Sequence, residues 1–164
     1  MTGLSRLAMV LLVAASAATA VDDELSRRSL KGLKGVEVVV ESLKAEAERD
    51  GLDETSIQTD VELKLRLAGI AVLTKEERLA APGTPFLYIN VNTQSGSLYA
   101  YSISVQLEQD VRLDRDPSTR ISATTWSVTS VGTVGRNNLR DVRDSIKDIV
   151  DIFINAYLSV NPKK

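Results

Sequence analysis

The longest regular pattern in this sequence is an alternation of apolar and polar residues that runs from Leu98 to Leu113. Successive side chains of a β-strand point to opposite faces of a sheet, so a period of two predicts a strand with one buried and one wet face. A strand of this length usually bends or bulges before its end. The apolar phase consists of Tyr99, Tyr101, Ile103, Val105, Leu107, Val111 and Leu113.

Two shorter strands are predicted on either side of this segment. Residues Phe86–Thr93 alternate in the same way, and Gln94–Ser97 supply the turn. In Arg120–Val134 the apolar phase changes between Ala123 and Trp126, which predicts a β-bulge near Thr124 and Thr125. The three strands together form an antiparallel meander.

The first half of the chain has the pattern of a strand, a helix and a second strand. Gly35–Leu43 contains a β-branched run that is typical of a central strand. Glu54–Ala68 has apolar residues at helical spacing, and Ile70–Leu73 is a short apolar strand. Strand, helix and strand in this order predict a right-handed parallel crossover.

Capping signals mark two further helices. Thr74 and Glu77 form a capping-box pattern that predicts a short helix. Asn138 is a good N-cap with Asp141 at the N3 position, and it predicts a helix over Leu139–Ser159. The apolar stripe of this last helix is Leu139, Val142, Ile146, Ile149, Val150, Phe153 and Tyr157.

The order β-α-β-β-β-β-α predicts an α+β fold with two layers. We expect a mixed, mostly antiparallel sheet of about five strands with both main helices on one face. The predicted domain covers residues 35–164. Residues 21–34 are polar and interrupted by glycine, so they are expected to form a flexible leader.

Residues 1–20 have the layout of a cleavable secretory signal peptide. Arg6 precedes an apolar run over Leu7–Val13, and Ala18-Thr19-Ala20 forms an A-x-A cleavage site. The alternative is an uncleaved anchor, but a membrane-spanning helix needs roughly 20 apolar residues, more than the run from Leu7 to Ala20 supplies. The sequence has no cysteine to carry a lipid. We therefore expect a periplasmic or secreted protein that is not inserted in the membrane after cleavage.

Composition excludes several kinds of chemistry. The chain has no histidine and no cysteine, which excludes a Ser-His-Asp triad, a histidine-bearing zinc site and a redox pair. Removing residues 1–20 takes away Arg6 and no acidic residue, so a mature chain is mildly acidic and lacks the basic excess of nucleic-acid binders. We predict no catalytic residue, no metal site and no cofactor. The basic cluster from Arg27 to Lys34 is interpreted as a solvated segment, or as a contact for an anionic envelope surface.

The polar phase of the predicted sheet is the first candidate site. If the helices cover the apolar phase, a row of short uncharged side chains lines the opposite face, where a partner strand, a second copy or an envelope polymer could dock. The alternative is an ordinary wet sheet face. Trp126 belongs to the strand that mixes the two phases, so it is placed either on this docking face or in the core. The candidate residues are Asn90, Asn92, Ser102, Ser104, Gln106 and Trp126.

The second candidate site is the segment that leads into the last helix. Gly135, Arg136 and Asn137 precede a helix N-terminus, where free N–H groups can hold an anion. No nucleotide-binding fingerprint matches this segment. The alternative is a plain turn between a strand and a helix.

The order of elements, from Val36–Val40 through Leu67-Ala68-Gly69 to the closing helix, resembles small periplasmic α+β domains of bacterial envelope proteins. Examples are the amino-terminal domain of the translocation protein TolB, the curli-secretion lipoprotein and the lipopolysaccharide-assembly lipoprotein. Leu63–Leu73 also resembles uncharacterised secreted bacterial proteins. The resemblance implies a non-enzymatic accessory domain that docks an envelope protein or polymer. The alternatives are a small hydrolase or lyase that uses two carboxylates, or a carrier with a closed apolar cavity.

Overall fold

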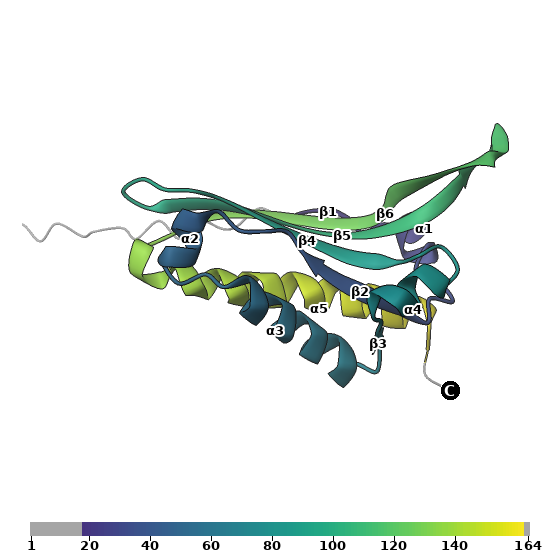
Figure 1. Ribbon diagram of the computed structural model, residues 1–164, viewed down its shortest axis with the longest axis horizontal. Helices are drawn as coiled ribbons and strands as arrows, with labels where there is room; N and C mark the ends of the chain where they lie inside the picture. The colour runs from purple at the N-terminus through teal and green to yellow at the C-terminus, as the bar shows by residue number, and fades with distance from the viewer. Residues whose placement is uncertain (1–17, 163–164) are drawn as a thin grey trace, which may run out of the picture.

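The computed structural model describes residues 18–162, which form one sheet with the long helices packed beneath it (Figure 1). The sheet has the strand order β1-β6-β5-β4-β2-β3. Strand β2 pairs in parallel with both β3 and β4, and the other pairs are antiparallel. The strands are β1 (Ala18–Val21), β2 (Gly35–Val40), β3 (Ala71–Val72), β4 (Phe86–Gln94), β5 (Tyr99–Leu113) and β6 (Asp116–Val134).

Two of the helices are long, and they form the second layer. The helix α3 (Glu54–Leu67) has 14 residues, and α5 (Val142–Val160) has 19. Both lie on the same side of the sheet (Figure 1). The predicted two-layer α+β fold is confirmed. The shorter helices are α1 (Glu24–Arg28), α2 (Ala45–Arg49), α4 (Lys75–Ala80) and the 3-10 helix η1 (Arg136–Asp141).

The core lies between the sheet and the two long helices. Ile103, Val105 and Leu107 point into it from β5, and the Trp126 ring meets the ring of Phe153 on α5 at 5.2 Å between centroids. Strand β5 keeps its apolar phase buried because every second residue faces the helices. The buried residues of α5 are Val142, Ile146, Ile149, Val150, Phe153 and Ala156.

The helix α3 buries a narrower stripe than its sequence suggests. Ile57, Val61 and Leu65 are fully buried, but Leu63 is 53% and Leu67 76% exposed. The last two fall on the outer side of the helix because α3 contacts the sheet and α5 along one stripe only.

The segment 22–34 is structured where the sequence predicts a flexible leader. Residues Glu24–Arg28 form α1, capped by the Asp23 side chain, and Leu30 is completely buried. The Asp22 carboxylate accepts hydrogen bonds from Arg27 at 2.7 Å and from Trp126 Nε1 at 3.0 Å. The prediction was wrong because the apolar Leu30, isolated among charged residues, belongs to the core.

Of the two predicted helix caps, one is confirmed. The capping box of Thr74 and Glu77 is present at the start of α4. Asn138 does not cap the last helix, because η1 forms over Arg136–Asp141 and α5 begins only at Val142. The chain thus enters α5 through a tighter 3-10 turn.

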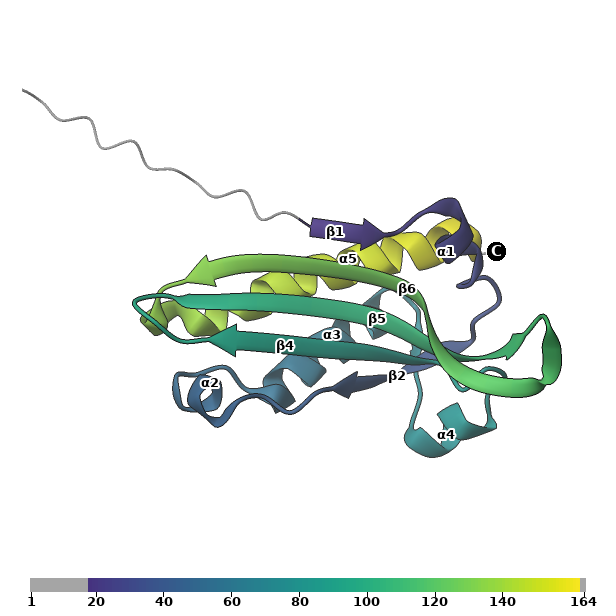
Figure 2. The same cartoon turned by 90° about the horizontal axis from the view of Figure 1, so that it is seen from above.

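A β-bulge divides the β5–β6 hairpin into two parts. Leu107 pairs with Trp126 and Glu108 with Thr124, so Thr125 is the extra residue. This confirms the bulge predicted near Thr124 and Thr125. Beyond the bulge the two strands continue as a ribbon that projects from the rest of the sheet (Figure 2). We call residues 108–124 the arm; none of its side chains is buried.

Candidate functional site

The face of the sheet opposite α3 and α5 carries the polar phase of the central strands. We call this surface the open face; Figure 1 shows no long helix on this side. The strand register brings the predicted residues together in rows, with Asn92 opposite Ser102, Asn90 opposite Ser104 and Gln106 opposite Ser127. Five of the six predicted docking residues therefore share one surface.

The side chains of these rows are short and make few bonds to one another. Asn92 donates to the Asn90 side chain, and the Thr129 hydroxyl donates to Ser104 Oγ at 3.4 Å. Asn92 is exposed, and Ser102, Ser104 and Gln106 are half-buried by their neighbours. A side-chain amide or hydroxyl has several donor and acceptor sites, so this surface keeps hydrogen-bonding capacity for a partner.

Aromatic residues lie at the β2–β4 side of the open face. Phe86 and Tyr88 are two residues apart on β4, and their rings meet edge to face at 6.5 Å. The Arg78 guanidinium of α4 lies over the Phe86 ring at 5.1 Å and pairs with Glu37 of β2. This aromatic margin was not predicted from the sequence.

Tyr88 is a neutral hydrogen-bond donor at ordinary pH. Hydrogen bonding with the nearby Glu41 carboxylate, followed by partial burial and the negative charges of Glu41 and Glu108, raises the pKa of Tyr88 to about 12. The aromatic margin therefore combines apolar rings, a phenol and acidic side chains.

Trp126 is not part of the open face. It lies in the core with 1% of its surface exposed, next to Phe153 and with its ring N–H bonded to Asp22. The bulge at Thr125 puts Trp126 in phase with Leu107, its partner on the helix side. The placement of Trp126 on the docking surface was wrong, and the alternative core position is the one observed.

In the predicted anion site at Gly135, Arg136 and Asn137, the arginine side chain is already engaged by carboxylates of the protein itself. Arg136 forms ion pairs with Asp50 and Glu46, and its guanidinium lies 5.1 Å from the centre of the Tyr99 ring. The hydrogen bond from the Tyr99 hydroxyl, followed by the charge of Arg136, lowers the pKa of Asp50. The segment begins a 3-10 helix rather than an α-helix. Arg136 therefore acts as a structural ion-pair partner, and the anion-site interpretation is not supported.

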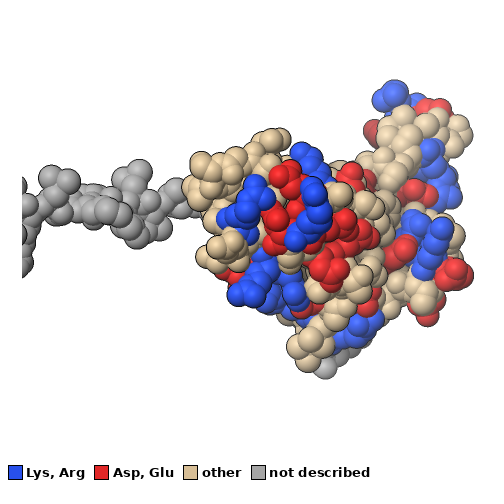
Figure 3. Space-filling view, turned by 60° about the vertical axis from the view of Figure 1, so that its left-hand side comes forward, with Lys and Arg blue, Asp and Glu red and all other residues tan. Residues whose placement is uncertain are grey.

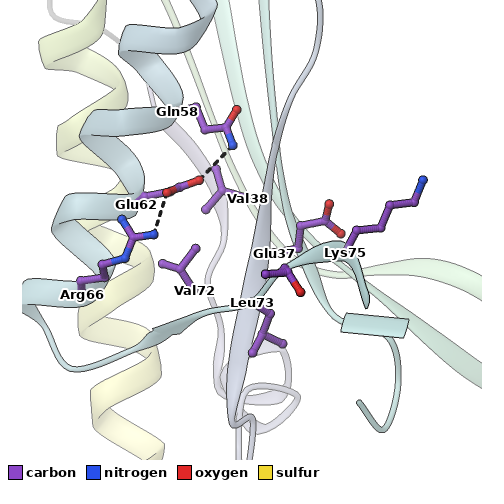
Figure 4. Close-up of a pocket in the computed structure, with 9 residues that line it drawn as sticks. Glu37, Val38, Gln58, Glu62, Arg66, Val72, Leu73 and Lys75 are labelled. Carbon is purple, nitrogen blue, oxygen red and sulfur yellow. Dashed lines mark hydrogen bonds and ion pairs between the residues drawn. The ribbon is translucent and has the colours of Figure 1, made fainter. Parts of the chain in front are cut away.

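A pocket of about 310 Å³ lies at the sheet edge between α3, β2 and the start of α4 (Figure 4). Its two carboxylates are both engaged. Glu62 accepts hydrogen bonds from Gln58 at 2.9 Å and from Arg66 at 2.8 Å, and Glu37 pairs with Arg78. The lining is largely polar, unlike the closed apolar cavity that a carrier would need.

Charges on the helical side are arranged in pairs of opposite sign. Arg143 of α5 bonds to Asp60 of α3 at 2.7 Å, and Lys147 pairs with Asp144 at 2.6 Å. In Figure 3, which brings the left-hand side of Figure 1 forward, blue basic and red acidic side chains lie next to one another over the surface. Within residues 18–162, no three acidic side chains are grouped to hold a metal ion.

Comparison of the chain with protein-family models, with curated proteins and with solved structures gives no match. None of the helices in the described part of the chain is long and apolar enough to cross a membrane. The open face is therefore the candidate functional site on the strength of its own geometry.

Proposed function

We propose that this protein is a non-enzymatic, exported accessory domain that docks a partner protein on its open face. One observation carries the proposal: the central strands present rows of uncharged hydrogen-bonding side chains on a face that neither long helix covers. The cores of protein interfaces are likewise depleted in charged residues.

The shape and chemistry of this surface suit a protein rather than a small molecule. Small ligands bind in concave pockets, and the pocket described above lies elsewhere, at the β2 edge. The aromatic margin supplies Tyr88, Phe86 and Arg78, and aromatic residues and arginine are enriched at protein interfaces. Because Glu41 and Glu108 lie beside Tyr88, we infer a partner with a polar, uncharged contact area and basic residues at its edge.

Export is part of the same proposal. The predicted signal peptide falls mostly on residues 1–17, which lie outside the described residues, and the predicted cleavage site follows Ala20 within β1. Expression in a bacterial host, followed by mass determination of the protein recovered from the periplasm or medium, is expected to give a chain that begins at Val21. Recovery of only the full-length chain from the cytoplasm would contradict export.

The hydrolase or lyase alternative receives less support. It requires two carboxylates of different protonation in one cleft, and Glu37 and Glu62 each bind an arginine instead. Glu62 lies outside the open face and its margin, so Glu62→Gln is expected to leave partner binding unchanged.

Capture from envelope extract with three forms of the protein tests the docking proposal. Ser104→Arg places a long cation in the middle of the open face, and Thr59→Arg makes a matched change on the exposed surface of α3. We expect the wild type and Thr59→Arg to retain the same protein. Ser104→Arg is expected to bind it at least about tenfold more weakly, because a steric clash at the centre of an interface reduces the free energy of binding by about 2 kcal/mol or more. Equal retention by all three forms would contradict docking on this face.

A further inference from the structure

The strand β6 is the last long strand of the sheet, with only the short β1 on its outer side, and its composition is unusual. From Ile121 to its end at Val134 it contains no charged residue and no proline. Natural proteins protect a long exposed edge with charges, prolines or a covering segment, because its free N–H and C=O groups can pair with another strand. A long edge without charges is therefore expected to be paired with another segment.

The cover in this structure is β1, and it is short. Residues Ala18–Val21 pair antiparallel with Ser127–Ser130 (Figure 2), and within residues 18–162 no strand pairs with Val131–Val134 on that side. The pairing shows that the β6 edge accepts an antiparallel strand. The predicted cleavage site after Ala20 lies inside β1, so cleavage removes three of its four paired residues.

We propose that cleavage after Ala20 uncovers the β6 edge and that a second copy of the chain then pairs with it, β6 to β6. A twofold axis at Val131 makes the pairing antiparallel and places Val131 opposite its own copy. Thr129 then faces Thr133, and Val128 faces Val134, so that β-branched residues meet across the new ladder. Val131 is 50% exposed in the single chain, and this contact covers it.

A second copy suits this edge because neither partner brings a charge to it. Two identical charged edges repel each other, whereas two uncharged ones do not. In the uncleaved chain β1 occupies Ser127–Ser130, half of the same interval, so the leader and the second copy exclude one another. The inference rests on the export part of the proposed function, that is on cleavage after Ala20, and not on docking at the open face.

The cleaved chain keeps the parts needed to fold. Among the described residues, all the buried apolar side chains lie between Leu30 and Ala156. Asp22, which binds the ring N–H of Trp126, also stays on the mature side of the cleavage site. The exported protein that begins at Val21 is therefore expected to fold, and it is suitable for the two experiments below.

The first experiment compares the molar mass of two forms by size exclusion with light scattering. One form is the exported protein that begins at Val21, and the other is the full chain made by cell-free synthesis without membranes. We expect the cleaved form to be a dimer. Val131→Lys is expected to make it monomeric, because two lysines would face each other, and Leu67→Lys, a matched change at a side chain 76% exposed on α3, is expected to leave the dimer intact. A cleaved form that stays monomeric at every concentration, or that forms open filaments, would overturn the inference.

The second experiment uses the absence of cysteine in the chain. A single Val131→Cys substitution puts two thiols within reach of a disulfide across the twofold axis, since paired strands bring opposite Cα atoms to about 4.5–5.5 Å. Oxidation is expected to cross-link the cleaved form at least tenfold faster than the full chain, and faster than Ile121→Cys in the arm. Equal rates in the cleaved form and the full chain would refute the occlusion by β1, and no cross-link in either form would refute the pairing of β6 with β6. Intact cross-linking combined with failure of the Ser104→Arg test would refute docking alone.

Discussion

Ile103 and Ser104 are neighbours in β5, and they face different surroundings. Ile103 is completely buried against the helical layer, while Ser104 is half-buried on the open face among hydroxyl and amide groups. The covered face is built from large apolar side chains whose packing stabilises the fold. The open face contributes little packing, and its hydrogen-bonding groups remain available. One face of the sheet thus determines stability, and the other can specialise in binding.

The largest effect is expected from a change on the covered face at Trp126. Trp126→Ala is expected to lower the free energy of unfolding by about 3–5 kcal/mol, because it leaves a cavity against Phe153 and removes the donor that Asp22 accepts from. Urea unfolding followed by circular dichroism measures this loss. Trp126→Phe, which keeps a ring in place, should cost clearly less; a cost of Trp126→Ala below about 1 kcal/mol would contradict the core assignment.

A pair of adjacent substitutions tests the contrast between the faces directly. Ile103→Ala is expected to cost about 2–5 kcal/mol, whereas Ser104→Ala should change the free energy of unfolding by no more than about 0.5 kcal/mol. Denaturant unfolding of both variants under the same conditions makes the comparison. Similar costs at the two positions would show that the open face is packed against something in solution.

An effect smaller than that of either core substitution is expected at the aromatic margin, and it depends on pH. The folded-state pKa of Tyr88 is raised from 10.0 to about 12, so the stabilisation from its neutral hydroxyl is fully present below pH 10 and is lost as the pH rises to about 12. Tyr88→Phe is expected to cost about 1 kcal/mol at neutral pH. Unfolding curves measured from pH 8 to pH 12 should show that the difference in free energy of unfolding between the wild type and Tyr88→Phe decreases as the pH rises. A difference that does not change with pH would contradict the bond to Glu41.

The regular elements were predictable because their side chains follow a period. The alternation in β4 and β5 and the stripe of α5 indicated the strands, the long helix and the buried face. Strand β1 was not predicted, because four residues give no period and they overlap the small residues of a cleavage site. The helix α1 was missed for a similar reason, since the single buried Leu30 stands among charged residues.

The candidate site was predictable in its centre and not at its margin. Asn90 and Ser104 fall in the polar phases of neighbouring strands, so their meeting follows from an antiparallel turn. The contact of Arg78 with Phe86 depends on where α4 lies after a parallel crossover, which local patterns do not specify. Arg136 was assigned to an anion site because its partner, Asp50, lies 86 residues away in the sequence.

The bulge at Thr125 also makes the tip of the hairpin a place for engineering. All the buried residues of β5 come before the bulge and all those of β6 come after it, so none lies in the arm. An epitope or a fluorescent label inserted between Asp114 and Arg115 would leave the ladder from Tyr99 to Leu107 in its native register. The arm can therefore change length without a change in the rest of the β5–β6 hairpin. An insertion at its tip is expected to label the protein without altering its fold.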